Sequence, residues 1–188
     1  MSKRGQILII IAFLIPVLLL FLAVAVDAGR LFIERGRMKR AAQGAADAGI
    51  SIVAEQMVTQ VVARQTIQAS TPSPTPPAAM TATPSLGDLQ AWLTNEDRAT
   101  LVSPSIQTAA GAEALLFARA NGFDIADPQT LVVDYVFPQD GFEPTDDDIY
   151  TFRFLVTIKR REVILLAGLL NKSFVHLEVD GLSEIPHR

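Results

Sequence analysis

Five acidic side chains crowd one short segment and are the first candidates for chemistry in this chain. They are Asp140, Glu143, Asp146, Asp147 and Asp148. Carboxylate oxygens are the ligands that Ca²⁺ prefers, so these residues form a candidate calcium site. Their spacing does not follow the EF-hand loop, and acids gathered between two strands are usually solvated charge. We therefore expect no metal and no cofactor, and we keep the five acids as the candidate ligands if Ca²⁺ binds.

The rest of the sequence offers few groups for catalysis. The chain has two histidines, His176 and His187, and no cysteine. His176 falls on the polar side of a predicted strand and His187 lies in the C-terminal tail, positions that do not favour a catalytic role. The sequence contains no Gly-rich phosphate loop, no HExxH and no GxSxG motif. We expect no enzymatic activity and no small-molecule substrate.

Charge divides the chain into a basic start and an acidic body. Residues 1–40 carry seven Lys or Arg and two acids, whereas residues 41–188 carry nine Lys or Arg and eighteen acids. The acidic body shows no basic patch with interleaved aromatics, which argues against nucleic acid as a partner. The mean hydropathy of +0.31 is high and indicates a membrane segment next to a solvated domain.

The membrane segment is predicted at residues 7–26, a run of twenty residues without a charged side chain. As a helix rising about 1.5 Å per residue, this run would cover about 30 Å, the thickness of a bilayer core. Pro16 near its middle is compatible with a membrane helix. The run is longer than the apolar core of a signal peptide, so we favour a retained anchor over a cleaved signal.

The stub at residues 1–5 leaves a second kind of processing open. It is short and basic and ends in glycine, as a prepilin leader does, so Gly5 and Gln6 mark a candidate cleavage point. Prepilins of the common type carry a glutamate five residues into the mature chain. Here that position is Ile10, which argues against cleavage.

The orientation of the span is contested by the charges beside it. Two basic side chains precede the run, and five follow it within fifteen residues: Arg30, Arg35, Arg37, Lys39 and Arg40. Because Lys and Arg mark the cytoplasmic side, this count favours a cytoplasmic C-terminal domain. Long domains translocate largely regardless of charge, however, so the count alone does not decide the orientation.

Beyond the span, residues 27–69 are predicted to continue the same helix, which would then run over residues 6–69. No proline occurs between Val17 and Thr71. At 100° per residue one face of this amphipathic part collects small and apolar side chains: Ala42, Ala46, Gly49, Val53 and Met57. Small residues let another helix or a sheet approach closely, so we expect a packing interface here. The face is predicted to fade after Met57, where Gln56, Gln60 and Arg64 fall on the same side.

The N-terminal region resembles the TadG-like branch of the TadE/TadG-like family of tight-adherence (Flp) pilus assembly. The resemblance covers residues 4–54 and rests on an ordered series: Arg4, Gly5, Pro16, Val26, Asp27, Gly29, Arg30, Gln43, Ala45, Ala46, Asp47 and Ala48. The TadE branch places a glutamate near the start of the span, and this chain has none there. The resemblance implies a single-pass protein of the inner membrane with a cytoplasmic N-terminus and an extracytoplasmic C-terminal domain.

The C-terminal part is predicted as a small α+β head behind a linker. Residues 70–85 are rich in Pro, Thr and Ser and form a spacer. In residues 86–188 we expect a short helix at 87–93 with Trp92 as a packing residue and a helix from about 105 to 121. We also expect a helical crossover at 162–171, which either packs on the domain or rests near the membrane. Period-two alternation predicts three strands with one buried face. The residues predicted for the buried face are Leu131, Val133, Tyr135 and Phe137 in the first strand, Phe152, Phe154, Val156 and Ile158 in the second, and Val175, Leu177 and Val179 in the third.

Two hypotheses follow. The first is a membrane-anchored, pilin-like or assembly component of a tight-adherence pilus system, in which a long helix is followed by a small antiparallel sheet packed on a helix. Its partners would be the lipid bilayer, other pilus-assembly or secretion-platform proteins, and further copies of itself. The alternative is a membrane-tethered extracytoplasmic binding domain unrelated to pili, with the acidic segment as a ligand or Ca²⁺ site.

Overall fold

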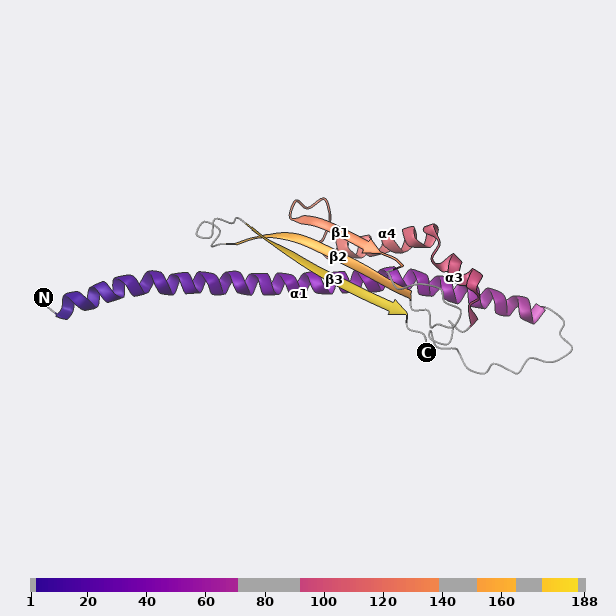
Figure 1. Ribbon diagram of the computed structural model, residues 1–188, viewed down its shortest axis with the longest axis horizontal. Helices are drawn as coiled ribbons and strands as arrows, with labels where there is room; N and C mark the ends of the chain where they lie inside the picture. The colour runs from indigo at the N-terminus through magenta and orange to yellow at the C-terminus, as the bar shows by residue number, and fades with distance from the viewer. Residues whose placement is uncertain (1–2, 71–91, 139–151, 165–173, 186–188) are drawn as a thin grey trace.

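The computed structural model describes residues 3–70, 92–138, 152–164 and 174–185. It confirms the α+β class, a long apolar N-terminal helix followed by a three-stranded antiparallel sheet with helices (Figure 1). The elements in chain order are α1 (Lys3–Ser70), α3 (Asn95–Leu101), α4 (Pro104–Ala120), β1 (Thr130–Val136), β2 (Phe152–Val163) and β3 (Phe174–Ile185). The predicted linker, apart from Ser70, and the acidic segment lie outside the described residues.

Helix α1 is the longest element of the structure, and α3, α4, β2 and β3 pack against it. It has 68 residues and continues through Pro16, which gives a length of about 100 Å at 1.5 Å per residue. From Ile10 to Val26 its large apolar side chains are exposed. By length and composition this part of α1 is a candidate membrane span.

Local sequence signals mark the starts of the two shorter helices and the end of α4. Thr94 and Asp97 form a capping box at the start of α3, which satisfies two backbone donors. Pro104 opens α4, and Gly122 follows that helix with a φ of +87°, a left-handed conformation that favours glycine.

Most of the helix predicted at 87–93 lies outside the described residues. Residues 87–91 are not described, and the next described helix, α3, begins at Asn95, where Thr94 caps it. Trp92, predicted as a packing residue, is 37 % exposed. It lines a small hollow together with Val61 and Arg64 of α1.

The sheet has the order β1-β2-β3, with both pairs antiparallel. The predicted buried face is correct for β2, where Phe152, Phe154, Val156 and Ile158 are at most 1 % exposed. The prediction for Leu131 is wrong. An irregular register between Thr130 and Val132 interrupts the alternation, so Thr130 is buried and Leu131 is exposed.

The helical crossover expected at 162–171 needs correction at its start. Its first two residues, Glu162 and Val163, are the end of β2 and pair with Val175 and Phe174 of β3. Strand pairing therefore continues into the segment that was predicted as a helix. Residues 165–173 lie outside the described residues.

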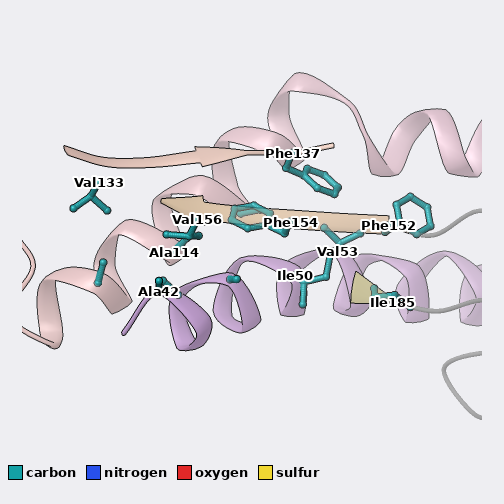
Figure 2. Packing of buried hydrophobic residues seen from close by; sticks show 14 of the residues in the cluster. Ala42, Ile50, Val53, Ala114, Val133, Phe137, Phe152, Phe154, Val156 and Ile185 are labelled. Carbon is teal, nitrogen blue, oxygen red and sulfur yellow. The ribbon is translucent and has the colours of Figure 1, made fainter. Parts of the chain in front are cut away.

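The core lies between two layers. Helices α1 and α4 pack together, and the sheet covers them, with β2 and β3 against α1 and β1 against α4 (Figure 1). Figure 2 shows Phe152 and Phe154 of β2 beside Ile50 and Val53 of α1, with Phe137 next to the same cluster. Among the described residues, the core of the head is shared with α1, because the helix supplies one wall of it.

Candidate functional site

The candidate site is a row of buried residues on α1, which we call the docking face. Its members are Met38, Ala41, Ala42, Ala45, Ala46, Gly49, Ile50, Val53, Met57 and Val61. All five residues predicted for the packing interface, Ala42, Ala46, Gly49, Val53 and Met57, lie within it. The expectation that the face fades after Met57 is wrong, because Val61 is 2 % exposed.

The head of the same chain covers the docking face. Phe154 of β2 lies over Gly49, where an added Cβ would come within 2.6 Å of the ring. Phe154 is fully buried and stacks on Tyr135 and Phe137, with ring centroids 5.7 and 5.6 Å apart. Fully burying a large apolar side chain stabilises a fold by about 1.5–3 kcal/mol. The small residues of α1 contribute mainly by letting such side chains approach.

Polar side chains of α1 form hydrogen bonds to β3, one of the two edge strands of the sheet. Lys39 donates to the carbonyl oxygen of Asp180, and Gln43 donates to that of Leu182 at 2.8 Å. Both acceptors belong to β3, which lies at the edge of the sheet. An edge strand exposes unpaired backbone groups that favour unwanted pairing. Two residues from the basic and amphipathic part of α1 therefore cover this edge.

A cluster around Arg160, which we call the Arg160 cluster, joins α1 to the head at the end nearer the span. The Arg160 guanidinium lies 2.9 Å from Glu162, 3.6 Å from Glu34 of α1 and 3.7 Å from Asp127. It also donates to Gln129 at 2.7 Å. Its side chain is only 14 % exposed, so these interactions are much less screened than those of a surface pair.

The sequence carries one signal of the Arg160 cluster that local patterns do not resolve. Arg160 continues the inward phase of β2 that begins with Phe152 and includes Ile158. A charged residue on the apolar phase of a strand requires a buried partner. The sequence does not show where that partner lies, because Glu34 is 126 positions away by residue number.

A second ion pair joins α1 to α3 at the other end of the docking face. Arg64 lies 2.7 Å from Asp97, and it also donates to the hydroxyl of Thr94 at 2.8 Å. Burial of Asp97 raises its pKa, but hydrogen bonds from Thr94 and Arg64 and the charge of Arg64 together lower that pKa below its usual 3.8. Asp97 is therefore ionised at neutral pH and holds both partners.

The residues of the family-like motif are spread along α1 rather than gathered at one point. Ala45 is fully buried in the docking face, Asp27 is 6 % exposed, and Ala48 is partly buried. Of the other described motif residues, Ala46 is fully buried, Gln43 is partly buried, and Pro16, Val26, Gly29, Arg30 and Asp47 are exposed. Gly5 and Gln6 lie within α1, but their side chains are outside what the structure describes.

Most of the predicted chemical groups lie outside the described residues. Asp140, Glu143, Asp146, Asp147, Asp148 and His187 lie outside them. Within the described ranges no three His, Asp or Glu side chains are arranged to hold a metal ion. His176 is exposed on β3, and its ring lies 5.2 Å from that of Phe174.

A shallow apolar groove lies between α4 and β1. It has a volume of about 310 Å³ and is lined by Ala112, Leu115, Leu116, Arg119, Phe123, Asp124, Ile125 and Val133. The two charged residues of its lining, Arg119 and Asp124, pair with each other at 2.8 Å. The described residues thus show extensive helix-to-sheet packing and one apolar groove.

Comparison with known proteins agrees with the N-terminal resemblance. No curated protein and no solved structure matches the chain. Residues 5–55 match the family model described as "Putative Flp pilus-assembly TadE/G-like", which does not distinguish the TadG-like branch. The matched region contains the candidate span and the docking face as far as Val53. The match and the candidate span together fit a component of pilus assembly.

Proposed function

We propose that this chain is a membrane-anchored structural component of a tight-adherence (Flp) pilus-assembly system, pilin-like in layout and without enzymatic activity. One observation carries the proposal. The residues that match the pilus-assembly family model are those that form the candidate span and most of the docking face. The matched region therefore combines a membrane anchor with the surface that holds the head.

The proposal assigns a mechanical role to α1. The span holds the protein in the inner membrane, and the docking face fixes the head along the next part of the same helix. The head can then present surfaces to other pilus-assembly proteins, to the secretion platform or to further copies of the chain. We assign the chain to the TadG-like branch because Ile10 occupies the position where the TadE branch carries a glutamate.

The first test is complementation of a strain that lacks this protein. Deletion should abolish Flp pili counted by electron microscopy, and the wild-type chain should restore them. Ala46→Glu, which places a carboxylate in the fully buried docking face, should restore few pili while the protein still floats with membranes. Ala63→Glu is the matched control, because Ala63 lies on the exposed side of the same helix. Normal piliation of the deletion strain would contradict the proposal.

The second test concerns orientation, which we propose is cytoplasmic for the N-terminus and extracytoplasmic for the head. The chain has no cysteine, so one introduced cysteine is a unique reporter. Glu113→Cys, on the exposed side of α4, should react with a membrane-impermeant maleimide in intact spheroplasts. Ser2→Cys should react only after lysis. The reverse pattern would place the head in the cytoplasm, as the charges after the span suggest.

A further inference from the structure

We propose that the end of the β2–β3 pair that holds Val163 and Phe174 is a second membrane contact, which lies in the bilayer interface beside α1. Val163 and Phe174 are the last described pair of the two strands. Both side chains are exposed, at 57 % and 38 %. This inference rests on the proposed anchoring of α1 in a membrane.

The contacts between the sheet and α1 give the height of this pair, which we define as its position along the axis of α1. Phe154 lies over Gly49 and Arg160 lies beside Glu34, so β2 runs antiparallel to α1, towards the candidate span. Val163 is three residues beyond Arg160, about 10 Å at 3.3 Å per residue. That distance equals six to seven residues of helix at about 1.5 Å each.

Val163 therefore lies near residue 28 of α1, just beyond the apolar run that ends at Val26. A second contact gives the same height. Gly181 of β3 lies against Ala42, and Phe174 is seven residues, about 23 Å, further towards the span. Figure 1 shows this end of the two strands reaching towards the N-terminal part of α1.

The outer face of the sheet, which points away from α1, changes character at this end. Further from the span it carries three cross-strand polar pairs, Arg153 with Glu184, Thr157 with Asp180, and Lys159 with Glu178, and one apolar pair, Leu155 with Leu182. At the end of the ladder this pattern gives way to Val163 and Phe174. Exposed apolar residues gathered where a solvated face ends indicate contact with an apolar environment.

Helix α1 has a similar exposed surface about one helical turn further from the span. Phe32 and Ile33 are 82 % and 64 % exposed, only six and seven residues beyond Val26, which is about 9–10 Å along the helix. Arg30 and Arg35 flank them and are exposed as well. Aromatic residues beside basic ones are typical of the membrane–water interface. Both α1 and the sheet therefore carry interfacial residues within about 8 Å of each other along the helix axis.

The residues next to Phe174 suit an anionic lipid surface. The Arg161 guanidinium lies 4.2 Å from the centre of the Phe174 ring. An arginine held over an aromatic ring can keep its charge near headgroups while the ring enters the apolar boundary. Basic side chains near an anionic surface gain about 1 kcal/mol each. With this contact and the span, the head would be held to the bilayer at two points.

The test uses the full chain in phosphatidylcholine–phosphatidylglycerol vesicles with lipids brominated near the headgroup. Trp92 is the only tryptophan, so Trp92→Phe provides a background for single-tryptophan reporters. Phe174→Trp should lose fluorescence about twofold, since interfacial side chains enter about 5–10 Å into the headgroup boundary. The control Leu182→Trp, 41 % exposed on the same strand and about 26 Å away, should not be quenched.

Phe21→Trp, in the span, separates this inference from the proposed function. If lipids brominated deep in the chain quench it while Phe174→Trp stays bright, only the second contact is wrong. If neither is quenched, both the anchor and the second contact are wrong. Equal quenching at Phe174 and Leu182 would mean that the head lies flat, which also overturns the inference. If Phe174→Trp lowers Tm, Val163→Trp takes its place with the same expected results.

Discussion

Gly181 of β3 lies directly against the backbone of Ala42 in α1. A Cβ at Gly181 would clash with the carbonyl carbon and oxygen of Ala42 and with the amide nitrogen of Gln43. These are backbone atoms of a helix, so they cannot move aside as a flexible side chain can. The approach requires glycine in the strand and a small residue in the helix, and it sets the distance between the sheet and α1.

Gly181→Ala should destabilise the head. Forcing a methyl group into a packed contact costs about 1–3 kcal/mol, so Tm in detergent should fall by several degrees. The control is Gly36→Ala, because a Cβ at Gly36 meets nothing within 4 Å and alanine favours a helix by about 0.5–1 kcal/mol. Equal Tm values for wild type and Gly181→Ala would mean that the sheet does not rest on α1 at this point.

Gly49 and Phe154 should show strong energetic coupling. Gly49→Ala gains helix propensity, but its Cβ would lie 2.6 Å from a ring that is fully buried. We expect a net loss of about 1–2 kcal/mol from overpacking. Phe154→Leu removes the ring, so Gly49→Ala should be neutral or stabilising in that background. A double-mutant cycle by chemical denaturation measures the coupling, and additive effects would contradict the packing described.

Replacing Arg160 should cost more than a surface charge would. Arg160→Met leaves Glu34, Glu162 and Asp127 without their shared cation, and the side chains of Arg160 and Glu34 are at most 14 % exposed. The expected loss is about 2–4 kcal/mol, measured by denaturant unfolding. Arg160→Lys should recover only part of it, because an ammonium cannot reach several acceptors as a guanidinium does.

A matched comparison shows whether burial is responsible for that cost. Arg153 forms a cross-strand pair with Glu184, and both side chains are nearly half exposed. Arg153→Met should therefore change the unfolding free energy by less than about 1 kcal/mol. If the two substitutions cost the same, the Arg160 cluster is no more than a surface ion pair.

Asp97 should make stability depend on pH at the acid end. Its pKa is lowered in the folded state, so its contribution is fully present above the unfolded pKa, near 3.8, and is lost as pH falls through the lower folded value. In Asp97→Asn the part of the acid slope below about pH 4 should disappear. Melting curves from neutral to strongly acidic pH test this, and parallel profiles for wild type and variant would exclude the role.

Local periodicity determined much of this fold. The charge-free run from residue 7 to 26 predicted an apolar helix, because length and hydropathy suffice for that inference. The 100° repeat predicted which face of α1 is buried, and the alternation of Phe152, Phe154 and Val156 predicted the buried face of β2. These patterns are readable because each reports only which side of one element avoids water.

Only the tertiary structure showed which distant residues contact each other. The sequence showed a face of small residues on α1 but not that Gly181 and Phe154 of the same chain cover it, since the contact depends on the register between distant segments. Contacts between distant segments also produce the Arg160 cluster, the exposure of Leu131 and the position of Val163 beside the span. Periodicity shows that one face of an element is buried. Which residues cover that face depends on how segments far apart in the chain fit together.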